Sequence, residues 1–492
     1  MSTDPTPKAS EKSADQIWHG DLFNRREEAE ILIRYIETVG QRPIIREDHR
    51  GFTLAVDAEY GFGKSFFLRR LAEHLRLSHP VAFIDAWVDD IADEPFTAIA
   101  ATLKQALKPL MQSGSVDQKW SKVTSKSGEI AKIVAKGLAK KGLGLLITGA
   151  AAEAVEKVLT EIDAAKSGDF SEDIKDVGAD ASSGVIDEAF KSNPKSIMDS
   201  RISDFENGRK SIDDLKKSVS DLVDEVAREG SKLPIVIIID ELDRCRPTYA
   251  IKLLEEVTHL FDVTGIVFVF GINAEQLSHS ISGVYGSGFD GQSYLRRFIN
   301  RSYNLQLPDL APLVEHLLNY HGISESYLEF LNIETGGTRS EHTASVMIAK
   351  YMKMYGFHAR DAFSVIDVIQ TCTAVVGQQR LFMPYLLPMI FGHIRGLKNG
   401  SAPPPLSSGG WMLSVYDVNA SGYVAISTVD MFNRMKSAAN WNMREIISSA
   451  NSGDYIGQIL SDYAGNARSG RFAPSAYEAL VQKLAAFSRS TE

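Results

Sequence analysis

Short apolar runs alternate with helical repeats along much of the chain. After the first run, Leu68, Leu71 and Leu75 recur at the three- and four-residue spacing of a helix face. Apolar runs joined by helices are typical of buried parallel strands with right-handed crossovers. The sequence therefore predicts an α/β fold whose core is a five-stranded parallel sheet, with strands at Phe52–Val56, Val81–Trp87, Ile235–Ile239, Ile266–Phe270 and Tyr303–Leu307.

One connection between these strands is far too long for a loop. Residues 111–232 leave the sheet and return, and this segment is rich in Ala, Ser, Lys, Asp and Glu. We expect it to be helical. Its last helix is expected to start near Ser211 and Asp214 and to have an apolar face made of Ile212, Leu215, Val219, Leu222, Val223 and Val226. Such an insert is either an interaction arm or a packing decoration, and the pattern leaves both open.

Composition and turn residues divide the rest of the chain. A polar leader precedes the first helical pattern, a helical region follows Pro308, and a stretch rich in Pro, Gly and Ser begins at Asn399. The predicted organisation is a disordered leader at 1–15, a first part of the core at 16–110, the helical insert at 111–232, a second part of the core at 233–308, an α-helical lid at 309–398, a linker at 399–410 and a small C-terminal region at 411–492.

Overall charge and cysteine content argue against several classes of protein. The 492 residues carry a net charge of −10, so the sequence gives no strong signal for nucleic-acid binding. The two cysteines, Cys245 and Cys372, provide neither a disulfide framework nor a zinc site. The best membrane candidate, Gly142–Ala152, is shorter than the roughly 20 apolar residues that a spanning helix needs. We therefore expect a cytoplasmic protein with no transmembrane segment.

The segment from Ala58 to Ser65, AEYGFGKS, ends like a phosphate-binding loop. It follows a predicted strand and precedes a predicted helix, which is where backbone N–H groups can converge on an anion. Lys64 stands at the position of the lysine for the terminal phosphates, and Ser65 at that of the hydroxyl for Mg²⁺. Ala58 replaces the usual first glycine, which costs strain if the backbone there needs a positive φ. The predicted nucleotide contacts are Glu59, Tyr60, Gly61, Phe62, Gly63, Lys64, Ser65 and Phe66.

Polar side chains also follow the third and fourth predicted strands. Asp240 and Glu241 end the third apolar run, where a Mg²⁺ ligand and an acceptor for the proton of attacking water are expected, respectively. A strand that simply ends in a solvated acidic turn is the alternative. Asn273 follows the fourth run, and it either orients the water or touches the γ-phosphate, or else caps the helix that begins at Ala274. ATP is the expected nucleotide, because the chain lacks the Asn-Lys-x-Asp element of guanine-specific proteins.

Taken together, these residues resemble the KAP family of P-loop NTPases, within the division that also holds AAA+ and STAND proteins. The loop of that family is similar to G-x-W-G-x-G-K-[ST]; here Tyr60 stands at the aromatic position, and Ala58 departs from the first glycine. The family's second motif, a strand followed by D-D-L-D-R-C, is matched by DELDRC at Asp240–Cys245. Two further motifs of the family are matched by FIDAW at Phe83–Trp87 and YLRRF at Tyr294–Phe298.

The resemblance implies roles for three arginines. Asp21–Arg25 is similar to an upstream D-x-x-x-R element that such proteins place near the nucleotide base, so Arg25 is an expected nucleotide contact. Arg297 lies where AAA+ relatives hold an arginine finger for a neighbouring subunit, and Arg360 resembles a second sensor arginine. A surface arginine or a structural ion pair is the alternative for each of them.

The resemblance also implies a Mg²⁺-dependent ATPase, a nucleoside-triphosphate phosphohydrolase that works as a regulatory switch or an assembly engine. KAP proteins of this kind resemble components of bacterial anti-phage defence systems such as Qat, which implies a homo-oligomer or a complex with separately encoded effector proteins. Two alternatives stay open. One is a nucleotide-gated scaffold with little hydrolysis, which Ala58 favours, and the other is an NTPase that associates with membranes through Gly128–Val158.

Overall fold

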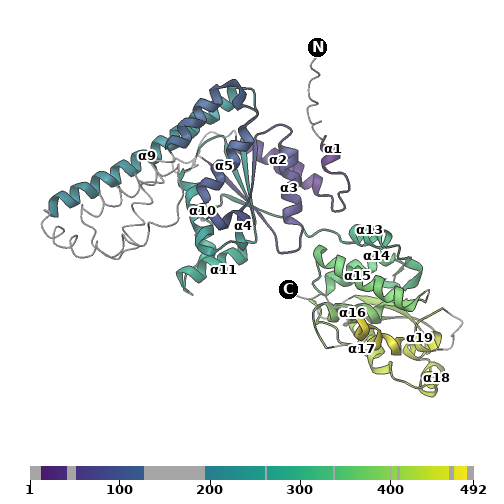
Figure 1. Ribbon diagram of the computed structural model, residues 1–492. Coiled ribbons are helices and arrows are strands. Elements are labelled where there is room, and N and C mark those ends of the chain that lie inside the picture. The colour runs from purple at the N-terminus through teal and green to yellow at the C-terminus, as the bar shows by residue number, and fades with distance from the viewer. Residues whose placement is uncertain are drawn as a thin grey trace, which may run out of the picture. The chain divides into compact units, whose positions relative to one another are not determined.

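The computed structural model describes residues 13–40, 51–92, 94–126, 194–260, 263–286, 288–335, 338–377, 379–398, 400–406, 411–464 and 470–484. Within this part, the chain forms two compact units (Figure 1). The first unit comprises the described residues of 1–17, 30–57 and 68–303, and the second comprises those of 18–29, 58–67 and 304–492. Residues 127–193 of the predicted insert, with the apolar segment Gly142–Ala152 and most of Gly128–Val158, lie outside the described residues, as do residues 1–12 of the leader.

Five strands form the sheet of the first unit, in the spatial order β2-β3-β4-β1-β5. β2 pairs with β3, β3 with β4, and β4 with β1, each in parallel. β3 and β4 are buried at every position, as central strands are when helices cover both faces of a sheet. The predicted α/β core is therefore confirmed. The strands are β1 (Phe52–Asp57), β2 (Val81–Asp85), β3 (Ile235–Asp240), β4 (Ile266–Ile272) and β5 (Arg301–Asn304).

β1, β3 and β4 run one or two residues past their predicted ends, and the bounds of the other two strands also differ from the prediction. The prediction carries β2 to Trp87, but the strand ends at Asp85, whose side chain accepts the Val88 N–H at 3.3 Å and starts a helix. A fifth strand is present, but its predicted bounds, Tyr303–Leu307, are wrong, because β5 runs from Arg301 to Asn304. Most of its residues are exposed, so no apolar run marks its position in the sequence.

Helices connect these strands and share their core. Side chains of α5, α9, α10 and α11 belong to the same buried cluster as those of β2, β3 and β4. The helices are α1 (Ala14–Ile17), α2 (Arg25–Gly40), α3 (Lys64–Leu75), α4 (Ala86–Asp89), α5 (Pro95–Leu107), α9 (Pro194–Arg228), α10 (Pro247–Leu260), α11 (Ala274–Tyr285) and α12 (Gly291–Leu295), with 3₁₀ turns at Asp90–Ala92, Met111–Ser113 and Leu242–Arg244. The first turns of α2 and α3 belong to the second unit.

The predicted insert returns to the sheet through α9, the long helix in Figure 1. The predicted helix start at Ser211 is wrong, because α9 begins at Pro194, a residue type that suits the first turn of a helix. None of the helices in the described part of the chain has the length and apolar character required to cross a membrane. The predicted apolar face of α9 is confirmed by the burial of Leu215, Val219, Leu222, Val223 and Val226.

The second unit is a mixed α/β body around one hydrophobic cluster. Its strands form a four-stranded sheet, in the order β11-β10-β7-β8, and a pair of β6 and β9. The strands are β6 (Leu328–Glu329), β7 (Ile333–Thr335), β8 (Thr338–Ser340), β9 (Leu381–Phe382), β10 (Met412–Asp417) and β11 (Gly422–Ser427). The helices are α13 (Ala311–Tyr320), α14 (Ala344–Met354), α15 (Ala359–Val376), α16 (Met383–Ile394), α17 (Thr428–Ala438), α18 (Met443–Asn451), α19 (Tyr455–Ala464) and α20 (Tyr477–Leu484), with 3₁₀ turns at Glu325–Tyr327 and Pro474–Ala476.

The region predicted as an α-helical lid contains α13 to α16 and also four short strands. β10 of the predicted C-terminal region pairs with β7 of the lid at Leu413 and Ile333, so the two regions share a sheet as well as a core. Residues 400–406 of the predicted linker are tied to the same body, because the Leu406 N–H donates to the Met354 carbonyl at 2.8 Å. The domain boundaries drawn from the sequence stay a prediction.

Candidate functional site

A loop with two left-handed glycines connects β1 to α3. Gly61 and Gly63 have φ values of 91° and 81°, a region that L-residues other than glycine seldom enter. Ala58 is not among the described residues with positive φ, so alanine at this position causes no backbone strain of that kind. The altered first position is therefore compatible with an unstrained phosphate-type loop.

The two glycines serve different purposes. A Cβ atom built on Gly63 would meet nothing within 4 Å, so there is open space beside this residue. A Cβ atom on Gly61 would lie 3.1 Å from the Cβ of His358, which precedes α15 in the second unit. The imidazole of His358 also packs on the ring of Phe62, with centroids 5.1 Å apart. Gly63 leaves room for a ligand, and Gly61 allows His358 to approach the loop.

Lys64 and Ser65 are the first two residues of α3. The Gly63 carbonyl accepts the Phe67 N–H at 2.9 Å, so the loop leads directly into the first helical hydrogen bond. Lys64 is only 9% exposed, whereas Glu59 is exposed and Tyr60 and Phe66 are 43% and 44% exposed. The predicted nucleotide contacts thus form one continuous turn at a helix N-terminus, where N–H groups and a lysine suit an anion.

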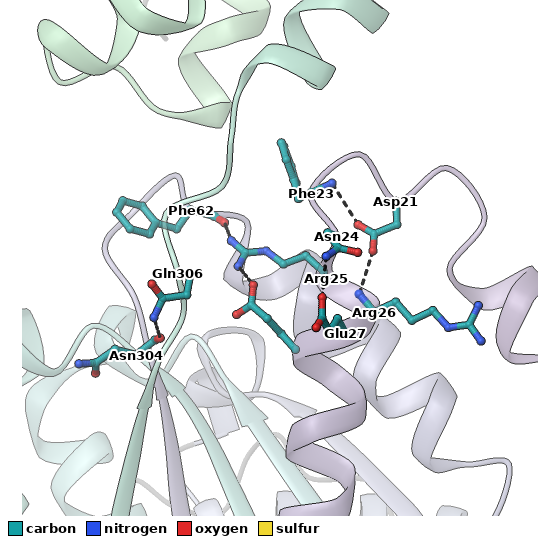
Figure 2. Close-up of polar contacts among 10 residues, drawn as sticks. Asp21, Phe23, Asn24, Arg25, Arg26, Glu27, Phe62, Asn304 and Gln306 are labelled. Atoms are coloured by element: carbon teal, nitrogen blue, oxygen red, sulfur yellow. Dashed lines mark hydrogen bonds and ion pairs between the residues drawn. The ribbon is translucent and has the colours of Figure 1, made fainter.

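Arg25 reaches this loop at Phe62 (Figure 2). Its guanidinium donates to the Phe62 carbonyl at 3.0 Å and to the Glu28 carboxylate at 2.5 Å, and the residue is 1% exposed. The turn before it is fixed by Asp21, whose carboxylate accepts the N–H groups of Phe23 and Arg26 at 3.2 and 2.8 Å. In the structure, Arg25 contacts Glu28 and the Phe62 carbonyl, and its predicted contact with the nucleotide base stays a prediction.

A cavity of about 860 Å³ opens beside His358 in the second unit. Its walls are apolar at Leu310, Met354 and Phe357. Lys350 and Lys353 add two positive charges, and Asp309 adds one negative charge. All of its lining residues lie between 307 and 411, so Arg25 is not among them. The predicted sensor arginine, Arg360, follows His358 by two residues and is exposed at the start of α15. This cavity can hold a flat, partly apolar group that is attached to an anion.

The carboxyl ends of β1, β2, β3 and β4 lie along one edge of the sheet in the first unit, because these strands are parallel. Asp240 ends β3 and is paired in register with Asp85 of β2 and Gly271 of β4. It is 1% exposed, and its carboxylate accepts the Glu241 N–H at 2.9 Å. A Cβ atom on Gly271 would lie 2.2 Å from Leu68 of α3 and 2.6 Å from the Asp240 carboxylate. The glycine therefore lets α3 and Asp240 close over β4.

Glu241 has a backbone conformation that is rare for its residue type. Its φ of 60° and ψ of 26° place it in the left-handed region, directly after β3. Non-glycine residues with such angles are associated with functional sites, where the surrounding structure maintains the strain. The Glu241 carboxylate forms an ion pair with Arg244 at 2.9 Å, and the Arg244 guanidinium lies 5.9 Å from the centre of the Trp87 ring. Glu241 is thus presented on a strained turn and paired with an arginine.

Asn273 follows β4 and caps α11, since its side chain accepts the Gln276 N–H at 3.2 Å. The neighbouring Ala274 N–H donates to the Asp57 carboxylate at 2.9 Å, which joins the end of β1 to the same helix. The capping alternative is therefore present in the structure, and the predicted catalytic role of Asn273 stays a prediction. Arg297 follows α12, is exposed, and lies over the ring of Tyr294 at 5.7 Å.

Some contacts of the site residues could not be predicted from the sequence. The pairing of Arg244 with Glu241 has a weak signal in its three-residue spacing, whereas the contact of His358 with Phe62 has none. Cys245 offers no thiolate near the acids, because burial, with help from the charges of Asp90 and Asp243, raises its pKa to about 12.

The donor set suits magnesium bound together with a nucleotide. In the part of the chain that the structure describes, no group of three or more His, Cys, Asp or Glu side chains could hold a metal by itself. Magnesium usually keeps several waters and takes one or two protein oxygens along with phosphate oxygens. A hydroxyl at Ser65 and a carboxylate at Asp240 are donors of that kind.

Comparisons with known proteins show which family the chain resembles and over which residues. The model of the KAP family P-loop domain matches residues 25–346. A search of curated proteins finds no match. Among solved structures, PCH-2 of C. elegans is 9% identical over 78% of this chain and 72% of its own, with a TM-score of 0.29. The ORC2 protein of Aeropyrum pernix, in ADPNP–ADP complexes, is 12% identical over 94% and 86%, with a TM-score of 0.30. CDC6P of Pyrobaculum aerophilum is 11% identical over 96% and 98%, with a TM-score of 0.31. Scores at this level carry no argument, so the fold rests on the sheet and the family match.

Proposed function

Because the chain belongs to the KAP family of P-loop NTPases, we propose that it binds ATP with Mg²⁺ and hydrolyses it. The observation that carries this proposal is the loop from Ala58 to Ser65, with its two left-handed glycines and a lysine and a serine at the start of α3. Backbone N–H groups and a buried lysine at that place are suited to a triphosphate.

The proposed roles follow from the chemistry of each side chain. Lys64 and the N–H groups of the loop bind the phosphates, while Ser65 and Asp240 hold the metal. Bound Mg²⁺ would neutralise the charge that develops on the phosphates. Glu241 accepts the proton of the attacking water, which its carboxylate can do when it is released from Arg244. The family match supports a joint role, because it spans both the loop and the acids.

The cavity beside His358 is our proposed site for the base and ribose. Its apolar walls suit a purine ring, and Lys350 and Lys353 suit the negative charge of a nucleotide. The contact of His358 with Phe62 and Gly61 supports this assignment, because it puts the rim of the cavity beside the phosphate loop within the same unit. A ligand that extends from the loop along His358 would then be held at both ends.

The wider role is also a proposal. ATP binding and hydrolysis would switch the protein between two states. Arg297 would complete the ATP site of a neighbouring copy, while Arg360 would act at the ATP site of its own chain. Cytoplasmic location is expected from the composition of the sequence, and partner effector proteins and a role in anti-phage defence are implied by the family resemblance. All three stay predictions.

Phosphate release from ATP with Mg²⁺ tests the enzyme proposal. The wild-type protein should release phosphate, and Lys64→Ala should not. Lys108→Ala, which removes an exposed lysine from the end of α5, should behave like the wild type. Equal and negligible release from all three proteins would rule out the ATPase. Trapping Glu241→Gln with ATP and Mg²⁺ and measuring its mass in solution tests the assembly, and a monomer under all conditions would contradict an intersubunit Arg297.

A nucleotide-gated scaffold with little hydrolysis is the second candidate. The observation that favours it is the ion pair between Glu241 and Arg244, which restrains the carboxylate that a hydrolase would use. A single-turnover assay of Arg244→Ala separates the two candidates. Faster phosphate release by the variant would identify a restrained enzyme, whereas ATP binding without release by both proteins would identify a scaffold.

A further inference from the structure

Arg25 is the largest side chain of the described residues that is almost fully buried, and its guanidinium binds Glu28 and the Phe62 carbonyl of the same chain. It is 1% exposed and lies between Glu28 and the carbonyl of Phe62, as Figure 2 shows. Burying a guanidinium is unfavourable unless a charge and hydrogen-bond acceptors compensate it. Glu28 supplies the charge from the next turn of α2, which leaves the second side of the guanidinium for the backbone of the phosphate loop.

The segment that carries Arg25 is built to hold it in place. Asp21 fixes the turn through the N–H groups of Phe23 and Arg26. Asn24 is in the left-handed region with a φ of 55°, which asparagine tolerates better than most residues, and its side chain donates to Glu27 at 2.9 Å. The guanidinium therefore extends from a turn whose backbone and polar side chains are already satisfied.

The contact of Arg25 with the Phe62 carbonyl also fixes the direction of the Gly63 N–H. The Phe62 carbonyl and the Gly63 N–H belong to one planar trans peptide, so they point in opposite directions. Because Arg25 binds the carbonyl, the Gly63 N–H must point away from Arg25. A Cβ atom on Gly63 would meet nothing within 4 Å, so there is open space beside this residue. A charged donor on the carbonyl also polarises the peptide and strengthens its N–H as a donor.

We propose that Arg25 is a positioning residue that aims the Gly63 N–H at the phosphates of the bound nucleotide, a role that rests on the proposed ATP binding. Arg25 acts through the Phe62–Gly63 peptide and not through the base or the ribose. Its effect therefore extends to any ligand with a chain of phosphates, whether or not that ligand carries a base.

The test compares the affinities for ATP and for inorganic tripolyphosphate, both with Mg²⁺. Arg25→Lys keeps the charge but loses the fork that joins Glu28 to Phe62, and it should weaken both ligands by the same factor, about tenfold. Arg25→Met combined with Glu28→Gln removes both charges and keeps an unbranched apolar stem at residue 25, so it provides a second test if the lysine variant is unstable. Arg26→Ala removes the neighbouring charge, which in Figure 2 extends away from Phe62, and should leave both affinities unchanged.

Three results would contradict the positioning role of Arg25. Loss of ATP affinity with unchanged tripolyphosphate affinity would overturn the proposal, because Arg25 would then act on the base or the ribose. Unchanged affinity for both ligands, with a lower thermal unfolding midpoint without ligand, would overturn it in favour of a purely structural ion pair. Failure of the wild-type protein to bind either ligand would instead overturn ATP binding itself, and this role with it.

Discussion

Replacing Gly271 with alanine should destabilise the sheet-bearing unit, because the new methyl group has no room. The added Cβ would lie 2.2 Å from Leu68 Cδ1 and 2.6 Å from Asp240 Oδ1, far inside van der Waals contact. Both neighbours are buried, Leu68 at 0% and Asp240 at 1% exposure. Overpacking of this kind usually costs about 1–3 kcal/mol, and we expect the upper part of that range because two groups must move.

The same variant should also disturb the site. Asp240 has to shift away from the methyl group, so Gly271→Ala should weaken the Mg²⁺-dependent part of ATP binding. Gly283→Ala is the matched control, because it adds the same methyl group within α11, where a Cβ would meet nothing within 4 Å. That variant should be more stable by up to about 1 kcal/mol, since alanine favours a helix over glycine.

Hydrogen exchange of the β3 and β4 amides, measured by mass spectrometry, reports the stability of this region without assuming that the whole chain unfolds at once. A double-mutant cycle with Leu68→Ala sharpens the result. The single change should cost about 2–5 kcal/mol, but it also empties the space that the Gly271→Ala methyl group needs. The double variant should therefore be more stable than additivity predicts. Additive effects, or an unchanged exchange rate in Gly271→Ala, would refute the close approach of α3 and Asp240 over β4.

Three further predictions concern other residues. Glu241→Asn should bind ATP without releasing phosphate and remain folded, because asparagine suits the left-handed backbone at this position, and release at the wild-type rate would contradict the catalytic role. Burial raises the pKa of Glu256 to about 7 from an ordinary value of 4.5, so the folded protein binds the extra proton between those values and should lose stability as the pH rises through them. Glu256→Gln should remove that loss in a urea titration series, and identical pH profiles for both proteins would count against it. Arg360→Ala should lower the rate of hydrolysis per chain at every protein concentration, while Arg297→Ala should lower it only at concentrations where the wild type assembles.

The sequence predicts the core of the fold well, for a physical reason. Strands β3 and β4 are buried on both faces, so they appear as unbroken apolar runs in the sequence. β5 is mostly exposed, so it lacks such a run and its predicted position is wrong. Strands of two or three residues, such as β6 and β7, are too short to show any period, and the sequence therefore predicts only helices from 309 to 398.

The candidate site divides in the same way. Lys64, Ser65, Asp240 and Glu241 are found from local patterns, because a strand, a turn and a helix start fix their positions. The partner of Arg25 is found only in three dimensions, because the Phe62 carbonyl lies 37 positions away and backbone oxygens leave no trace in a sequence. The strain at Glu241 is equally hidden, since glutamate rarely adopts a left-handed backbone and no composition rule predicts it.

In the proposed mechanism, the phosphate loop and the acids after β3 act on one Mg²⁺-bound ATP. Titration of ATP with and without Mg²⁺ into the wild type, Lys64→Ala and Asp240→Asn tests this mechanism. We expect Mg²⁺ to tighten ATP binding to the wild type. Asp240→Asn should retain the Mg²⁺-free affinity but lose the tightening, and Lys64→Ala should weaken binding under both conditions. Tightening by Mg²⁺ that is the same in Asp240→Asn as in the wild type would contradict it.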